Sequence, residues 1–149
     1  MKRILQLIVV LFLAISCNLK DDCGECFTPP PQFNFDIVDA ITGENLFLNE
    51  TFAEEAVRVY DDLGSEVEFK LVFHRERYIL SLSEIGWELD PKIYTIELST
   101  NIKVSFILDM DQASSDCCTY FEVKEFKVLD YEYEELLPTG IIQIKIELN

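Results

Sequence analysis

The sequence predicts an all-β domain over residues 32–149, folded as a sandwich of two antiparallel sheets. Three observations support this prediction. Past Pro31, apolar residues recur at every second position, which is the pattern of a strand with one buried and one solvated face. Turn sequences such as Asp61-Asp62-Leu63-Gly64 and Pro138-Thr139-Gly140 separate these runs. About seven to nine short strands in a domain of this length are typical of a two-sheet sandwich.

The first 16 residues have the organisation of a secretory signal peptide. Two cations, Lys2 and Arg3, precede a run of 12 uncharged residues from Ile4 to Ile15. As a helix this run would span about 18 Å, which is too short for a bilayer core of about 30 Å. We therefore expect residues 1–16 to be a leader that is removed on export.

The residues at the end of the leader indicate how the protein is held. Ala14-Ile15-Ser16-Cys17 resembles the lipobox of bacterial lipoproteins, in which signal peptidase II cuts before a diacylated cysteine. The resemblance implies a lipid on Cys17, which would bind the protein to a membrane without a spanning helix. Two or three acyl chains make a firm anchor, because each buried CH₂ contributes about 0.8 kcal/mol.

Lys20-Asp21-Asp22, shortly after Cys17, resembles the export signal that sends lipoproteins of the phylum Bacteroidota to the outer face of the outer membrane. The acid-rich composition and the Cys23-x-x-Cys26-Phe-Thr-Pro-Pro-Pro segment are similar to small lipoproteins of that group. The resemblance implies a bacterial outer-membrane location with the domain facing the cell surface. Two alternatives stay open: the polar residues only solvate the chain, or the protein faces the periplasm.

Residues 17–31 are expected to form a tether between the lipid and the domain. Pro29, Pro30 and Pro31 each fix φ and lack an N–H, so they exclude a helix here. Fully extended, the tether reaches at most about 50 Å. A proline-rich docking ligand is the alternative, although the run is short for one.

Six alternating runs in the domain have the period of half-buried strands. They are Phe33–Ile37, Val67–Phe73, Tyr78–Leu82, Tyr94–Leu98, Ile102–Leu108 and Ile142–Leu148. The stretch from Phe52 to Tyr60 also allows a helix, because Phe52, Ala56 and Val59 would share one face. We expect a short helical turn at Thr51–Glu55 and then a strand at Val57–Tyr60.

The run from Thr119 to Tyr133 changes phase twice. Phe121 and Val123 share one parity, Phe126 and Val128 the other, and Tyr131 and Tyr133 return to the first. A β-bulge near Lys124-Glu125 and a bend near Leu129-Asp130 would account for both changes. A strand that crosses from one sheet to the other is the alternative.

Asp39-Ala-Ile-Thr-Gly-Glu-Asn-Leu46, followed by Val57-Arg-Val-Tyr-Asp-Asp-Leu-Gly64, resembles the opening strands of transthyretin-like and carboxypeptidase-regulatory-like sandwiches. In that pattern a Thr-Gly turn leads into a strand that ends in another Gly turn. The resemblance implies a transthyretin-like sandwich, with an immunoglobulin-like one as the alternative. It implies no activity, because such sandwiches carry unrelated functions.

Lipidation of Cys17 leaves four cysteines in two groups, Cys23 with Cys26 and Cys117 with Cys118. An exported domain lies in an oxidising compartment, where such thiols pair. Because a bridge between adjacent cysteines is strained, we expect each bridge to join one cysteine of each group. A four-cysteine zinc site is an alternative, although adjacent cysteines lack the spacer of typical zinc sites. Other pairings and free thiols also stay open.

Few residues in the sequence are suited to catalysis. His74 is the one histidine; it ends an alternating run beside Arg75-Glu76-Arg77, and we expect a turn residue there. No Gly-x-Ser-x-Gly motif and no glycine-rich phosphate loop occurs. We therefore predict neither enzymatic activity nor a cofactor. A hydrolase with an unrecognised carboxylate or metal site is the alternative.

Two further features are candidate ligand sites. Asp109, Asp111 and Asp116 could line a calcium site, but the glycine and the closing glutamate of an EF-hand are missing, so we expect a polar loop. Trp87 could be an exposed platform on which a ligand stacks. In a domain with so many strands we expect it to fill the core instead.

The charge of the chain limits the classes of partner. The formal net charge of −16 repels nucleic acid and anionic headgroups, and it keeps an exterior domain soluble. We predict a non-catalytic binding or assembly module, held on a membrane through Cys17, with a protein or glycan partner and no nucleic acid. A purely structural envelope lipoprotein is the alternative.

Overall fold

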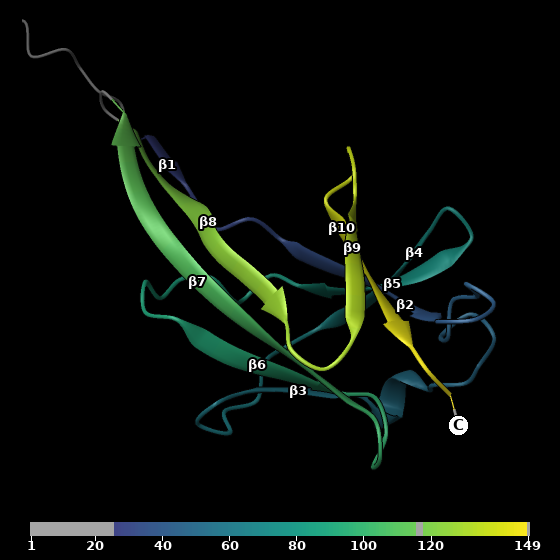
Figure 1. Ribbon diagram of the computed structural model, residues 1–149. Helices are drawn as coiled ribbons and strands as arrows, with labels where there is room; N and C mark the ends of the chain where they lie inside the picture. Colours follow the sequence, from purple (N-terminus) through teal and green to yellow (C-terminus); the bar gives the residue numbers. More distant parts are fainter. Residues whose placement is uncertain (1–25, 116–117, 149) are drawn as a thin grey trace, which may run out of the picture.

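The computed structural model describes residues 26–115 and 118–148, and nearly all of its regular structure is β (Figure 1). The elements in chain order are β1 (Cys26–Thr28), β2 (Phe33–Asp39), the 3₁₀ turn η1 (Glu54–Ala56), β3 (Arg58–Asp61), β4 (Lys70–His74), β5 (Arg77–Leu82), β6 (Lys92–Glu97), β7 (Lys103–Ser115), β8 (Cys118–Val128), β9 (Glu132–Leu136) and β10 (Ile141–Ile146).

The strands form two five-stranded sheets that pack face to face. The first sheet has the order β1-β8-β7-β6-β3, and the second has the order β4-β5-β2-β10-β9. This arrangement confirms the predicted all-β, two-sheet sandwich. Two pairs, β1 with β8 and β2 with β10, are parallel, whereas the other pairs are antiparallel as predicted. Parallel neighbours need a crossover, and here the chain passes through the other sheet between β2 and β10.

The space between the sheets is filled with aromatic and branched side chains. Phe106 of β7 lies at its centre, with ring centroids 5.2 Å from Phe35, 5.5 Å from Tyr94 and 5.4 Å from Phe126. The alternating positions predicted for the buried faces are buried in β2, β6, β7 and β10, and in β5 except for the half-buried Tyr78. Removing this apolar surface from water is the main force that holds the sheets together.

The buried carboxylate of Asp36 on β2 accepts hydrogen bonds from three other segments of the chain. Asp36 is 1% exposed, and its oxygens accept hydrogen bonds from Asn45 Nδ2 (2.8 Å), Arg77 NH1 (2.8 Å) and Gln143 Nε2 (3.0 Å). Arg77 begins β5 and Gln143 lies in β10, so this one side chain connects the three central strands of the sheet. All these donors are needed because an unpaired buried carboxylate is costly.

The predicted strand Val67–Phe73 is divided between the two sheets. The N–H of Val67 donates to the carbonyl of Val59, on the edge of the first sheet, whereas β4 begins at Lys70 in the second sheet. The chain therefore changes sheets inside a run whose alternation never breaks. The helical turn expected at Thr51–Glu55 lies slightly later, at η1, and β3 follows it as predicted.

Both phase changes predicted between Thr119 and Tyr133 are confirmed. Asp109 pairs with Glu125 and Met110 with Val123, so Lys124 is the extra residue of a bulge in β8. After Val128 the chain leaves the first sheet, and β9 joins the edge of the second. The bulge and the sheet crossing, which were alternatives, occur one after the other.

Two predictions, one for the stretch after Leu108 and one for the end of the tether, were wrong in part. The polar stretch after Leu108, expected to be a loop, continues β7 as far as Ser115, because its backbone pairs with β8 along the whole length. The end of the predicted tether, Cys26–Thr28, is β1 and pairs with Cys118–Tyr120. We call β1 and the parts of β7 and β8 beyond the bulge the arm, which projects from the sandwich in Figure 1.

Candidate functional site

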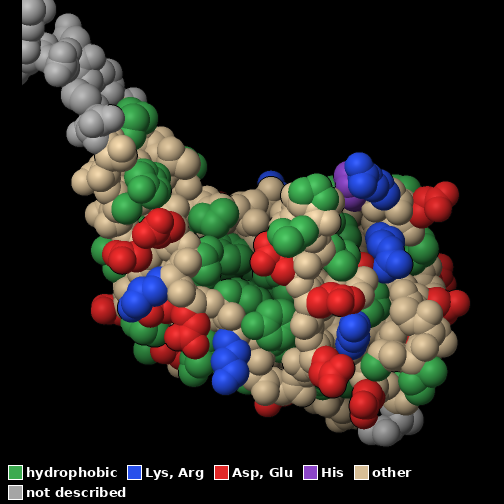
Figure 2. All heavy atoms as spheres, turned by 45° about the horizontal axis from the view of Figure 1, so that its top comes forward, with side chains coloured by type: hydrophobic (Ala, Val, Ile, Leu, Met, Phe, Trp, Pro, Cys, Tyr) green, Lys and Arg blue, Asp and Glu red, His purple; other side chains and the backbone are tan. Residues whose placement is uncertain are grey.

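A groove between the two sheets, where β8 and β9 diverge, is the most distinctive surface of the described chain. It has a volume of about 370 Å³, and Figure 2 shows hydrophobic side chains gathered in this hollow between the arm and the second sheet. The lining residues come from the β1–β2 connection, β2, β8, β9, the β9–β10 turn and the start of β10. They are Pro31, Gln32, Phe33, Asn34, Val123, Phe126, Tyr133, Glu135, Thr139, Gly140 and Ile142.

The local sequence explains why the groove stays open. Pairing of β1 with β8 stops after Thr28 because Pro29, Pro30 and Pro31 have no N–H to donate. Beyond Tyr120, no described strand pairs with that edge of β8. The sheet crossing then places β9 on the other side of the gap.

The walls of the groove are held by aromatic contacts. The ring of Tyr133 meets that of Phe126 edge to face at 5.7 Å, and its hydroxyl donates to the backbone carbonyl of Phe126 at 3.2 Å. Phe126 also stacks on Phe33 of the second sheet at 6.3 Å. The Tyr133 side chain therefore contacts one backbone carbonyl of the unpaired β8 edge. The exposed Val123 extends the apolar wall of the groove along β8.

One acidic side chain belongs to the groove. Glu135 pairs across the sheet with Ile142, whose side chain faces the interior, so Glu135 points to the same side and lines the groove. Glu132 and Glu134 lie at the other parity of β9. The groove thus combines apolar walls with a carboxylate at its rim, a combination suited to binding a segment that carries both apolar and basic groups.

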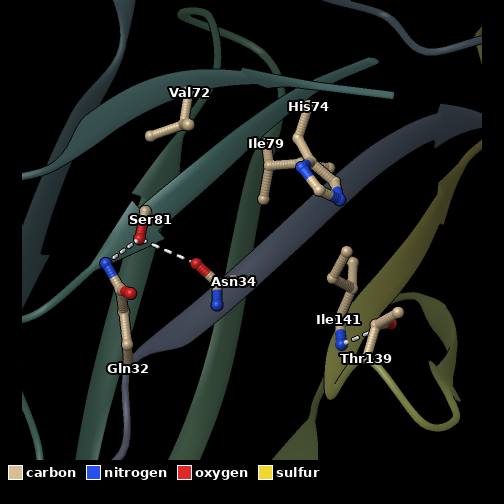
Figure 3. A pocket seen from close by; sticks show the side chains of 8 residues that line it. All are labelled: Gln32, Asn34, Val72, His74, Ile79, Ser81, Thr139 and Ile141. Carbon is tan, nitrogen blue, oxygen red and sulfur yellow. Dashed lines mark hydrogen bonds between the residues drawn. The ribbon is translucent and has the colours of Figure 1, made fainter. Parts of the chain in front are cut away.

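A second hollow, of about 260 Å³, lies on the outer face of the second sheet (Figure 3). There Gln32 Nε2 donates to Ser81 Oγ at 2.6 Å, and the Ser81 hydroxyl donates to Asn34 Oδ1 at 2.8 Å. His74 ends β4 as predicted and lines the same hollow. In Figure 3 its ring lies away from these hydrogen-bonded side chains. Because the Ser81 proton points to an amide oxygen and not to an imidazole, this arrangement does not activate a nucleophile.

Trp87 does not fill the core, so that expectation was wrong. It lies in the β5–β6 connection with 48% of its surface exposed. It stacks on Phe27 of β1 at 6.1 Å and meets Phe121 of β8 edge to face at 5.7 Å. The two preceding residues, Ile85 and Gly86, take the buried positions of this connection, and even a Cβ on Gly86 would meet Pro30 at 3.0 Å.

The predicted cross-pairing of the two cysteine groups is present in the described residues. Cys26 and Cys118 form a disulfide across the parallel β1–β8 pair, with their Cα atoms 4.6 Å apart. Their sulfurs are therefore not free as thiolates for the alternative zinc site. Cys23 and Cys117 lie outside the described residues, as do the predicted lipid attachment residue Cys17 and the export-signal residues Lys20, Asp21 and Asp22.

Two of the three candidate calcium ligands, Asp109 and Asp111, lie on β7. Asp109 is buried on β7 and its Oδ2 accepts a hydrogen bond from Lys124 at 2.7 Å, which raises the pKa of the lysine ammonium above its usual value. The exposed Asp111 accepts from the N–H of Gln112, and Asp116 lies outside the described residues. Within residues 26–115 and 118–148, no three His, Cys, Asp or Glu side chains are placed to hold a metal ion.

In comparisons with known proteins, no family model, curated protein or solved structure matches this chain. Among the described residues there is also no helix long and apolar enough to cross a bilayer. Sequence reasoning missed the groove residues Val123, Tyr133 and Glu135. The signal was present in the changes of parity around them, but parity alone does not show that two strands part.

Proposed function

We propose that the protein is a lipid-anchored, exported envelope lipoprotein whose sandwich domain binds a protein partner without catalysing a reaction. The groove between β8 and β9 is the observation that carries this proposal. The leader and Cys17 support export and lipidation. The Cys26–Cys118 disulfide supports an oxidising compartment, because such bridges persist mainly outside the cytosol. The location that fits these features is the outer membrane, with the domain facing the cell surface.

The chemistry of the groove favours an extended segment of a partner protein. The unpaired edge of β8 offers backbone groups to which a strand can add, and the walls beside it are apolar. Glu135 at the groove and the net charge of −16 favour a segment that carries a basic residue. A strand of this kind would continue the pairing that the prolines end at Thr28.

Photo-crosslinking in intact cells tests this binding site. A photoreactive amino acid at Val123, which is exposed in the groove, should capture one partner protein. The same amino acid at Leu63, exposed in the β3–β4 turn, should not. Adding Glu135→Lys should abolish the product, because it places a cation against the basic segment. Glu132→Lys, on the same strand at the other parity, should leave the product unchanged.

Two outcomes would contradict the proposed site. One is equal capture from Val123 and Leu63. The other is loss of the product in Glu132→Lys to the same extent as in Glu135→Lys, which would indicate a response to net charge alone. Absence of any product at Val123 would favour the purely structural alternative.

The anchor has a test of its own. Cys17→Ala should release the protein from membranes, because no acyl chain can be attached. Fractionation and labelling with a palmitate analogue measure both effects. A variant that stays membrane-bound and lipid-labelled would refute the anchor. Protease treatment of intact cells should degrade the wild-type domain if it faces the surface and spare it if it faces the periplasm.

A glycan is a second candidate partner, and the hollow of Figure 3 is what favours it. Gln32, Asn34, Ser81 and Thr139 present amide and hydroxyl groups there beside the aliphatic side chains of Val72 and Ile141. Neutral hydrogen-bonding groups of this kind suit sugar hydroxyls. Titration with soluble oligosaccharides should then shift the NMR signals of Val72, His74 and Ser81, which line this hollow and not the groove, and unchanged spectra would exclude this candidate.

A further inference from the structure

Three aromatic side chains, two from the arm and one from the β5–β6 connection, form an exposed cluster outside the groove. Phe27, Trp87 and Phe121 contact one another, with ring centroids between 5.7 and 6.1 Å apart. Phe27 is 54% exposed and Trp87 is 48% exposed. Large aromatic surfaces in water are unfavourable, and when grouped they mark a contact with something else. We call these three residues the aromatic cluster.

The chain path places this cluster beside the point where the tether enters the domain. The Cys26–Cys118 disulfide fixes β1 to the arm, and Phe27 is the next residue. From Cys17 to Cys26 there are nine residue steps, which span about 30 Å at full extension. The cluster therefore adjoins the residue where the tether from Cys17 enters the described domain, within reach of the membrane that holds the anchor.

We propose that the aromatic cluster rests in the headgroup region of the membrane that holds Cys17 and so fixes how the domain stands on it. The inference rests on the lipidation of Cys17 proposed above. Tryptophan and similar rings favour this interface, where their apolar bodies leave water while polar edges stay hydrated. A short tether also makes the contact intramolecular, with an effective concentration in the millimolar range, so a weak contact suffices.

The surroundings of Trp87 are compatible with a zwitterionic surface. The carboxylate of the neighbouring Glu88 is paired with Lys92 at 2.7 Å, so this acid is not an uncompensated charge. The contact is apolar in origin, since the net charge of −16 opposes anionic headgroups. Phosphatidylcholine is therefore the lipid with which to test it.

The chain contains a single tryptophan, so its fluorescence reports on this cluster alone. The lipidated full-length protein is inserted into phosphatidylcholine vesicles, with or without bromine on the acyl chains close to the headgroup. Flotation first shows whether the protein is bound. Trp87 emission should shift to shorter wavelength on binding and should be quenched by the bromine. Phe27→Ser should reduce the quenching, whereas Leu137→Ser, exposed in the β9–β10 turn, should not.

Each other outcome identifies a different failure. Protein that does not float with the vesicles contradicts the lipid anchor, and the inference fails with it. Protein that floats but gives equal emission in both lipids keeps the anchor and overturns the membrane contact. A blue shift that increases with protein density and ignores bromine means that a second copy covers the cluster, which also overturns the proposal.

Discussion

Replacing Asp36 by alanine removes the acceptor to which Asn45, Arg77 and Gln143 all donate. Hydrogen bonds to a charged group contribute about 1.5–3 kcal/mol each, and breaking a buried ion pair costs about 3–5 kcal/mol. Arg77 is 41% exposed and can turn toward water, which favours the lower end of that range. We expect Asp36→Ala to lower the free energy of unfolding by about 3 kcal/mol.

Thermal and urea unfolding of the disulfide-intact domain measure this loss. A loss of this size corresponds to a fall of about 10 °C in Tm for a domain of this size. Glu66→Ala is the control for an exposed pair, because the Arg58–Glu66 contact of 3.3 Å, against 2.8 Å for Asp36–Arg77, joins side chains that are 68% and 72% exposed. Removing such an exposed pair costs about 0–1 kcal/mol.

A double-mutant cycle with Arg77→Ala separates the ion pair from the other two hydrogen bonds. We expect a coupling energy of about 1.5 kcal/mol or more between Asp36 and Arg77, since the carboxylate is buried. The reasoning is refuted if Asp36→Ala costs no more than Glu66→Ala. A coupling energy near zero would refute the part assigned to Arg77.

Three further predictions concern the disulfide, a glycine and an acidic turn. Replacing all four of Cys23, Cys26, Cys117 and Cys118 by serine should lower the urea midpoint. The loss is up to about 4–5 kcal/mol of stability in the loop-entropy model, because the Cys26–Cys118 bridge spans 92 residues and no second cross-bridge can then close the same loop. An unchanged midpoint contradicts this. Gly86→Ala should lower Tm more than Gly64→Ala. Both glycines have positive φ, but of the two only Gly86 would bring a Cβ against another side chain, that of Pro30 at 3.0 Å. Equal losses of Tm would rule out this clash. The hydrogen bond from the Ser65 backbone N–H lowers the pKa of Asp61 below its usual 3.8. Asp61 therefore contributes stability that is fully present above pH 3.8 and is lost as the pH falls through the lowered pKa. Asp61→Ala should therefore be less stable than wild type at neutral pH and approach it in acid, and a difference that stays constant with pH would refute the assignment.

Much of the sandwich follows from local pattern, because alternation reports which side of each strand meets water. The buried faces of β2 and β10, the turn at Asp61–Gly64 and the bulge at Lys124 were all predicted in this way. Each depends on neighbours within a few residues along the chain. The cross-pairing of the cysteine groups could also be predicted, because short-range geometry strains a bridge between the adjacent Cys117 and Cys118.

The candidate site could not be predicted in the same way. Tyr133 and Glu135 line a groove because β9 leaves β8 for the other sheet. Trp87 is exposed while the preceding Ile85 and Gly86 are buried. Neither arrangement can be recognised from the sequence around these residues. The continuous alternation across Val67–Phe73 shows the same limit, since a strand keeps its period when it changes sheets.

The sequence by itself determined that this chain forms two layered sheets, and it indicated a leader, a lipid anchor and an acidic exterior. The tertiary structure decided which strands are neighbours, where an edge is left unpaired and which aromatic rings face water. The physical reason is that side-chain periodicity is a property of one strand, whereas pairing and exposure depend on contacts between residues far apart in the chain.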